Sequence, residues 1–270
     1  MKLSRTTPAL LVLLLISPLT SAHKRWFMPT DFVLSEAETV TVDFTASNNI
    51  FFVDKGMPLA GVSVHSPAGT ALPLLQPQEG ARRSSFDIEV SEAGTHRVSF
   101  GGEPMYFVSY QMPGENEPRH DRGNLAGLKA AIPPEATEIA FAEAHSLIET
   151  FVTLGSETAP AAPADSAGLR LVLRDTHPNA LYTDEPARFA FTLDGEPLPG
   201  LAVSVQPEGS RYRDTQELRE YVTDAAGAVE ISWPVVGRYL LEAGLEQELG
   251  EGEIRKRYYS YFLTLEVLAP

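Results

Sequence analysis

Short runs rich in β-branched and aromatic residues recur through most of this 270-residue chain. In the first half these runs are TVTVDFTA (39–46), AGVSVHSP (60–67), SSFDIEVS (84–91), THRVSFGG (95–102) and MYFVSYQM (105–112). In the second half they are LRLVLRD, ARFAFTLDGEPLPGLAVSVQ, REYVTDAAGAVEISWP, GRYLLEAGLE and RYYSYFLTLEVL. Their lengths, and the Gly, Pro, Asn or Asp residues between them, predict β-strands. Strand after strand at this spacing favours antiparallel β-sandwiches over βαβ units.

Two segments between strand-like runs have the composition of tight turns. They are LDGEPLPG (193–200) and TDAAG (223–227). Asp and Gly adopt the backbone conformations that hairpin turns require. We expect a β-hairpin at each.

Two segments of the first half depart from the strand pattern. Residues 113–138 combine charges, Gly and a Pro-Pro pair, which indicates a long irregular or partly helical excursion. Residues 138–155 have a period that fits either a helix or a strand. We expect a helical or irregular start that runs into a strand at LIETFVTLG (147–155).

A segment rich in Ala, Pro and Ser, residues 156–168, separates the two sets of runs. It has no apolar face to bury, and this composition is typical of linkers. We therefore expect an all-β protein with two antiparallel β-sandwich (immunoglobulin-like) domains, at residues 23–155 and 169–270.

The first 22 residues have the features of a secretory signal peptide. Lys2 and Arg5 precede an apolar run, and small residues end the segment at Ala22. The apolar run is shorter than the ~18–20 residues that a membrane span needs. We expect cleavage after Ala22 and a periplasmic location.

The charge balance argues against some partners. The chain has 21 Lys and Arg residues against 36 Asp and Glu residues, a formal charge of -15, which becomes -17 without Lys2 and Arg5. An acidic surface repels nucleic acid and anionic lipid. Because the chain has no cysteine, a transition metal would need His, Asp, Glu, Met, backbone or amino-terminal ligands.

Cleavage after Ala22 would make His23 the first residue of the working protein. Its α-amino group and imidazole could then close a chelate ring on one metal ion, which an internal histidine cannot do. Such nitrogen ligands suit copper and nickel. The alternative interpretation is that His23 only marks the cleavage site, while Trp26, Phe27 and Pro29 anchor the chain to the first sheet.

A further ligand would come from the other histidines, which are His65, His96, His120, His145 and His177. His145 ranks first, because Glu143 and Glu149 lie two residues before it and four after it, so that a carboxylate shares its face in either a strand or a helix. His120 ranks second, because it lies in the long excursion, where mobile ligands are plausible. The alternative for each of these histidines is a solvated or hydrogen-bonded structural role.

Signatures of common enzymes are absent from the sequence. It contains no Gly-x-Ser-x-Gly elbow, His-Glu-x-x-His helix, phosphate-binding Gly loop or dinucleotide fingerprint. We therefore expect a protein that is not an enzyme.

Several segments together resemble an exported bacterial family known as domain of unknown function 4198. They are AHKRWFMP (22–29), ETFVTLG (149–155), HPNALYTDEPARF (177–189), LDGEPLPGLAVSV (193–205), TDAAGAVEISWPVVGRYLLEA (223–243) and YYSYFLTLEV (258–267). The resemblance implies a periplasmic two-part β protein associated with nickel and cobalt uptake.

Two functional hypotheses follow from the sequence. In the first, the protein binds a transition metal ion (nickel, cobalt or copper) through His23, with His145 and His120 as further candidate ligands, and passes it to a membrane metal transporter or receptor. In the alternative, it is a non-enzymatic cell-envelope binding or adhesion module that recognises carbohydrate or a partner protein without metal. Substitution of His23 separates the two, because only the first requires it.

Overall fold

The computed structural model describes residues 23–161, 167–173 and 175–270. The predicted signal peptide (1–22) and part of the predicted linker (156–168) therefore lie outside the described residues. No helix in the described part of the chain has the length and apolarity that a membrane crossing needs.

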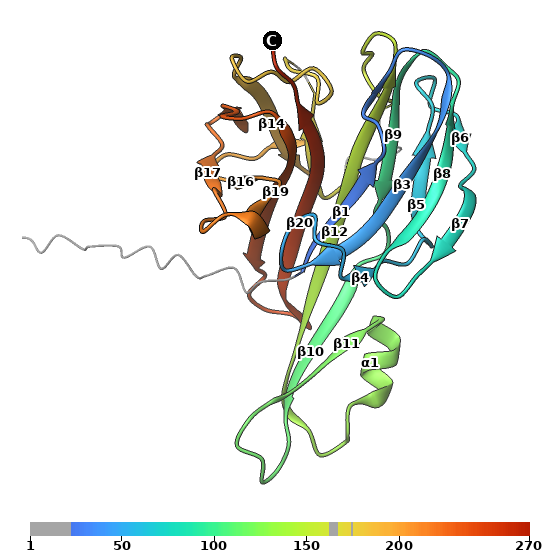
Figure 1. The fold of residues 1–270 in the computed structure, drawn as a ribbon. Helices are drawn as coiled ribbons and strands as arrows, with labels where there is room; N and C mark the ends of the chain where they lie inside the picture. Colours follow the sequence, from blue (N-terminus) through green and yellow to red (C-terminus); the bar gives the residue numbers. More distant parts are fainter. Residues whose placement is uncertain (1–22, 162–166, 174) are drawn as a thin grey trace, which may run out of the picture.

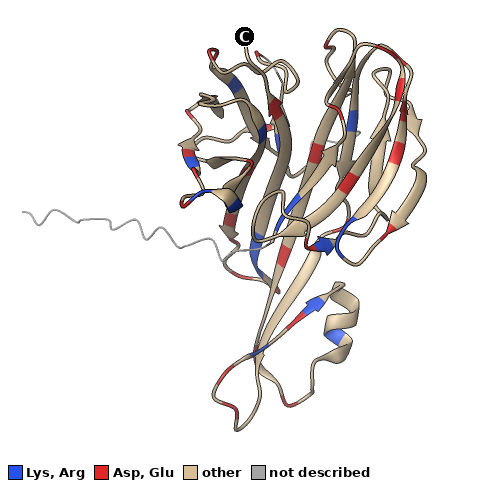
Figure 2. Ribbon diagram, in the orientation of Figure 1, with Lys and Arg blue, Asp and Glu red and all other residues tan. Residues whose placement is uncertain are grey.

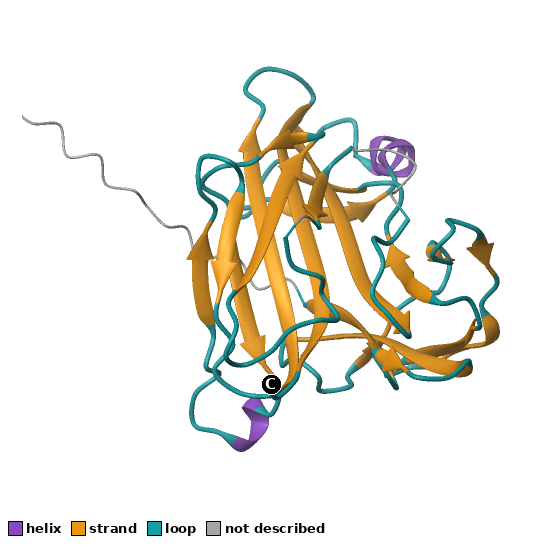
Figure 3. Ribbon diagram, turned by 90° about the horizontal axis from the view of Figure 1, so that it is seen from above, coloured by secondary structure: helices purple, strands orange, loops and turns teal. Residues whose placement is uncertain are grey.

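Strands make up most of the molecule (Figure 3). The first twelve are β1 (Lys24–Pro29), β2 (Val33–Leu34), β3 (Glu38–Ser47), β4 (Lys55–Gly56), β5 (Val62–His65), β6 (Ala71–Leu72), β7 (Leu75–Glu79), β8 (Ser84–Val90), β9 (Gly94–Phe100), β10 (Met105–Gln111), β11 (Arg119–Gly123) and β12 (Thr137–Leu154). The others are β13 (Leu169–Val172), β14 (Ala187–Leu193), β15 (Glu196–Pro197), β16 (Ala202–Pro207), β17 (Arg219–Val222), β18 (Ala228–Ile231), β19 (Gly237–Glu248) and β20 (Ile254–Val267). The helix α1 spans Leu125–Ala131, and a 3-10 turn, η1, spans Ser210–Tyr212.

These strands form three sheets. Sheet A has the order β1-β3-β8-β7, with β4 paired to β3. Sheet B has eleven strands along β17-β16-β19-β20-β12-β9-β5-β6, with β10, β11 and β2 attached to it. Sheet C has the order β13-β14-β15, with β18 paired to β14. Most pairs are antiparallel, so the all-β sandwich prediction is confirmed.

The strands form where the sequence alternates. In β8, for example, Phe86, Ile88 and Val90 are buried while the residues between them are more exposed, as expected for a strand with one face toward a core. Their partners across the core come from the facing sheet. Within sheet A, Phe27 of β1 stacks on its cross-strand neighbour Phe44 of β3, with ring centroids 4.2 Å apart, and both rings are buried in the core.

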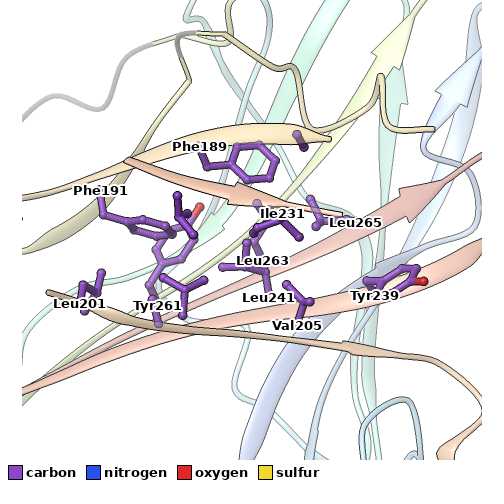
Figure 4. Packing of buried hydrophobic residues seen from close by; sticks show 14 of the residues in the cluster. Phe189, Phe191, Leu201, Val205, Ile231, Tyr239, Leu241, Tyr261, Leu263 and Leu265 are labelled. Carbon is purple, nitrogen blue, oxygen red and sulfur yellow. The ribbon is translucent and has the colours of Figure 1, made fainter. Parts of the chain in front are cut away.

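Sheet B lies between the other two sheets and packs against both (Figure 1). One of its faces carries Ile148 and Phe262, which belong to the core with sheet A. The opposite face carries Leu147 and Tyr261, which belong to the core with sheet C. Figure 4 shows this second core, with Phe189 of β14 facing residues of β19 and β20. Thus β12 and β20 each contribute to both sandwiches.

The pairing of β12 with β20 joins the two halves of the chain. The two strands run parallel from Phe141 beside Ile254 to Glu149 beside Leu263. Sheet B therefore continues from the first half of the chain into the second without a break. The domain limits at residues 155 and 169 remain a prediction, and the structure adds that the halves share this sheet.

The expected helical or irregular start of residues 138–155 is wrong. Residues Thr137–Leu154 form one 18-residue strand, β12. Its first half pairs with β10 on one side and with β20 on the other. These partners satisfy the backbone hydrogen bonds of the segment. Pairing with distant strands therefore selects a strand where the sequence pattern fits either a helix or a strand.

The predicted excursion is partly helical, as expected. It contains β11 and α1, and together with β10 it forms an arm that projects away from the two sandwiches (Figure 1). The side chain of Asn124 caps α1 by accepting a hydrogen bond from the amide of Gly127 at 2.8 Å. Leu128 packs with Val108 and Phe141 in a small cluster that holds the helix on the sheet.

The two predicted hairpins have different outcomes. LDGEPLPG forms one, because β14 and β15 pair directly across Asp194 and Gly195. TDAAG does not, because β17 pairs with β16 in sheet B whereas β18 pairs with β14 in sheet C. This turn therefore carries the chain from one sheet to another.

Candidate functional site

A cavity of about 650 Å³ lies where sheet B passes from the first half of the chain to the second. Its walls come from β5, β9, β12 and β20 of sheet B and from the chain around β13. It is lined by Ser63, His65, Arg97, Ser99, Gly101, Gly102, Glu143, His145, Ser146, Leu147, Ala161, Ala167, Gly168, Leu169, Arg170, Asp194, Arg257, Tyr259 and Ser260. We call it the junction cavity.

One end of the junction cavity is built on a buried ion pair. Arg97 of β9 donates from Nε to Glu149 Oε1 of β12 at 2.6 Å, and its Nη2 atom pairs with the same oxygen. Tyr261 of β20 donates its hydroxyl to Glu149 Oε2 at 2.7 Å. Burial, with the adjacent Glu149 charge, raises the pKa of Tyr261 well above its usual value. The phenol is therefore a fixed hydrogen-bond donor, and it orients the carboxylate that orients Arg97.

The other end is built on a second carboxylate of the same strand. Glu143 accepts from His145 Nε2 at 2.7 Å and from Arg257 Nε and Nη2 at 3.0 and 2.9 Å. The hydrogen bond to Glu143 raises the pKa of Arg257, which stays a cation. The His145 ring stacks on Tyr259 with centroids 5.2 Å apart. Each planar side chain of this wall is thus held in one orientation.

Hydroxyl groups complete the lining. Ser63 of β5 and Ser99 of β9 stand opposite each other, with their Oγ atoms 2.9 Å apart. Each hydroxyl can both donate and accept, so the pair can serve either kind of ligand atom.

Of the three predicted metal ligands, only His145 lines the junction cavity. His120 lies on the arm, where Ser109 pairs with it on one side and with Ala140 on the other. His145 is five residues further along β12, so standard strand spacings place the Cα atoms of His120 and His145 roughly 19 Å apart. The structure does not bring these two histidines together.

His23 is exposed and directly precedes β1. The neighbouring Arg25 reaches Ser146 of β12 at 3.1 Å, on the face of sheet B that meets sheet A. Glu143, His145 and Leu147 alternate onto the opposite face. Among the described residues, no group of three or more His, Asp or Glu could hold a metal ion. Ligation by His23 remains a prediction, because its terminal amine forms only on cleavage.

The sequence analysis identified part of this site and missed the rest. The carboxylates flanking His145 share its face, as expected, because all of them lie in one strand. His65 lines the same cavity, although the sequence offered no reason to select it. Arg97 and Arg257 were also missed, since each reaches β12 from a strand distant in sequence.

The comparisons with known proteins identify the family. No curated protein matches the chain in sequence. Among solved structures, the D0–D1 domain of Intimin covers 89% of this chain and 97% of its own, with 9% identity and a TM-score of 0.23. Escherichia coli alpha-2-macroglobulin, activated by porcine elastase, matches 92% of this chain over 20% of its own, with 12% identity and a TM-score of 0.21.

A third structure comprises three N-terminal domains of the Highly Immunogenic Outer Capsid protein (Hoc) of bacteriophage RB49. It covers 92% of this chain and 100% of its own, with 8% identity and a TM-score of 0.22. TM-scores this low carry no argument about this chain. Sequence is more specific, because residues 20–247 match the family described as "Domain of unknown function (DUF4198)". The chain therefore belongs to the DUF4198 family.

Proposed function

We propose that this protein is a non-enzymatic binding module of the cell envelope that holds a carbohydrate ligand in the junction cavity. The observation that carries the proposal is the cavity itself, whose walls present arginine, histidine, glutamate and serine side chains in fixed orientations. The predicted signal peptide supports a periplasmic location for this activity.

The size and chemistry of the cavity favour this ligand class. Its volume of about 650 Å³ lies within the ~300–1,000 Å³ of common ligand pockets. Glu143 lines one end, and at the other end Arg97 is held by the buried Glu149; six residues of β-strand separate the two carboxylates by ~20 Å. A sugar chain is extended and carries many hydroxyl groups, so it can contact donors and acceptors along that length.

The orientation of the lining side chains supports selective binding. Arg97, Glu143 and His145 already make hydrogen bonds within the protein, and their rotamers are held before a ligand arrives. Preorganised groups lose little conformational freedom on binding, which favours affinity. Surface acidic and basic residues, in contrast, are scattered over the sheets and the arm (Figure 2).

The test is a glycan array probed with the full chain, exported and processed in a bacterial host. His145→Ala, in the cavity, is compared with His120→Ala, on the arm. We expect glycan binding that His145→Ala weakens at least tenfold and that His120→Ala leaves unchanged. Equal effects of the two variants, or no glycan bound, would reject the proposal.

A second candidate is metal capture by His23, followed by handover to a membrane metal transporter or receptor. The observation that favours it is the exposed position of His23 at the start of β1. The terminal amine and imidazole of His23 would form the chelate, and nickel, cobalt or copper is the proposed ion.

Copper(II) electron paramagnetic resonance distinguishes this candidate from the first. The processed chain is compared with one that carries an extra Met before His23, and with His23→Ala. A nitrogen-rich tetragonal signal at one equivalent, lost in both altered chains, supports metal capture. The same loosely bound copper signal in all three rejects it.

A further inference from the structure

The junction cavity is rich in basic side chains on a protein that is acidic overall. Among the residues that the structure describes, its basic lining residues are Arg97, Arg170, Arg257, His65 and His145, and its acidic ones are Glu143 and Asp194. The whole chain shows the reverse balance, with 36 acidic residues against 21 Lys and Arg and 6 His. The lining therefore differs in composition from the rest of the chain.

The two acidic side chains already accept hydrogen bonds from the protein. Glu143 accepts from His145 and Arg257 through both of its oxygens. Asp194 accepts from the amide of Gly168 at 2.8 Å. A ligand that brought mainly donors would compete with these bonds, whereas a ligand that brings acceptors would not.

The arginines at the two ends keep capacity for such acceptors. Arg97 uses Nε and Nη2 on Glu149, and among the described residues its Nη1 atom has only a long contact of 3.4 Å, to the carbonyl oxygen of Ala161. Arg257 bonds Glu143 through Nε and Nη2, and its side chain is 33% exposed. Because a carboxylate balances each charge, recognition here depends on directed N–H donors rather than on net charge.

His145 adds a different requirement. Its Nε2 atom bonds Glu143, and its Nδ1 atom makes no hydrogen bond with any residue in the described part of the chain. When Nε2 carries the proton, Nδ1 is an acceptor, which suits a ligand hydroxyl. The two arginines thus favour acidic oxygens, whereas His145 and the pair of Ser63 and Ser99 favour hydroxyl groups.

We propose that the ligand of the junction cavity is an acidic oligosaccharide whose carboxylates contact Arg97 at one end and Arg257 at the other. This inference rests on the proposed carbohydrate-binding function and names the class of carbohydrate. Uronic acid chains have the required chemistry, since each unit combines a carboxylate with hydroxyl groups.

The test uses isothermal titration calorimetry on the full processed chain. The probes are oligosaccharides of galacturonic, glucuronic and mannuronic acid, each paired with its carboxyl-reduced form, which has the same sugar ring without the charge. We expect at least one acid form to bind at least tenfold more tightly than its reduced partner. Equal or tighter binding of the neutral forms overturns the inference but leaves carbohydrate binding intact. No binding by any acidic or neutral glycan overturns both.

A matched pair of variants locates the contact. Arg257→Gln removes the charge and keeps a hydrogen-bonding side chain, while Arg255→Gln makes the same change on the same strand outside the cavity lining. We expect Arg257→Gln to weaken binding of the acid form at least tenfold and to leave that of the reduced form unchanged. Equal binding by the two variants overturns the assignment. If Arg257→Gln does not fold, the comparison of acid and reduced ligands on the unaltered chain still tests whether the ligand is an acidic oligosaccharide.

Discussion

At the residue scale, the ion pair of Arg97 and Glu149 buries two opposite charges inside the protein. Both side chains lie almost entirely out of solvent, and Tyr261 is fully buried beside them. Desolvation of two charges is costly, so such a pair is stable only when its geometry and its additional hydrogen bonds are good. The loss of one partner leaves the other charge without compensation.

We therefore predict that Glu149→Gln lowers the free energy of unfolding by ~3–5 kcal/mol, because it leaves Arg97 buried and unpaired. Urea unfolding at neutral pH is the measurement. Glu248→Gln is the control, since Glu248 pairs with Lys256 at the surface and such pairs contribute only ~0–1 kcal/mol. A loss for Glu149→Gln no greater than that for Glu248→Gln would contradict the prediction.

Tyr261→Phe tests the next partner of the same cluster. It removes the hydroxyl that donates to Glu149 and keeps the ring in the core. Hydrogen bonds to charged groups contribute ~1.5–3 kcal/mol, so we expect a loss in that range in the same urea measurement. An unchanged unfolding midpoint would show that the phenol does not hold the carboxylate.

Two other histidines, His96 and His177, should make stability depend on pH. Burial lowers the pKa of both, more than the nearby Glu92 and Glu157 raise it. The hydrogen bonds of His177 fit its neutral form, because Nδ1 accepts from the backbone amide of Asn179 while Nε2 lies 3.2 Å from the carbonyl oxygen of Thr158. Protonation of Nδ1 would break the first of these bonds.

The sign of the effect follows from proton binding. As the pH falls through the reference pKa of ~6.5, these rings take up protons in the unfolded chain, while in the folded chain their lowered pKa keeps them neutral. Protonation therefore favours the unfolded chain, and stability falls as pH decreases. We predict a lower urea midpoint at pH 5.5 than at pH 7.5, and a smaller difference in the double variant His96→Gln, His177→Gln. An identical pH dependence in both proteins would rule out these histidines as its source.

At the element scale, the turn that crosses from sheet B to sheet C depends on Gly227. This residue has φ +73°, and an added Cβ atom would lie 2.5 Å from the carbonyl oxygen of Phe191 and 2.9 Å from the amide nitrogen of Leu198. Both contacts are with backbone, which cannot easily move aside. Asp224 supports the same turn by accepting from the amides of Ala226 and Ala228.

We predict that Gly227→Ala destabilises the protein more than Gly200→Ala does. Gly200 has a similar φ of +75° but open space around its Cβ position, so its substitution carries only the conformational cost, ~1 kcal/mol. The excess for Gly227→Ala measures the backbone clash. Thermal unfolding of both variants is the measurement, and equal losses would show that the turn relaxes.

At the scale of the whole molecule, neither half of the chain builds a core from its own residues alone. Leu147 and Phe151 precede the predicted linker, yet they belong to the core of sheet C. Leu240 and Phe262 follow it, yet they belong to the core of sheet A. The parallel ladder between β12 and β20 joins the same two halves through the backbone.

We therefore predict one cooperative unfolding transition for the entire chain. Differential scanning calorimetry should give a calorimetric enthalpy equal to the van't Hoff enthalpy, as expected for two-state unfolding. Two separate transitions would mean that the halves are stable independently and that the shared sheet couples them weakly.

Local features of this protein can be predicted from its amino-acid sequence. Alternation in segments such as 84–91 determined strands, because side-chain period and burial are local properties. The composition of residues 113–138 predicted an irregular or partly helical excursion, and Asp194 and Gly195 predicted a hairpin. The position of Glu143 and Glu149 around His145 likewise placed a carboxylate on the histidine's face.

Features that depend on contacts between distant segments become visible only in the assembled sheets. The long strand β12 forms because β10 and β20 satisfy its backbone, and the TDAAG turn joins two sheets because its flanking strands pair elsewhere. The junction cavity arises in the same way, since Arg97 and Arg257 reach Glu149 and Glu143 from strands 52 and 114 positions away in sequence. Sequence patterns record the environment of each strand but not its partner, so these contacts appear only once the sheets are assembled.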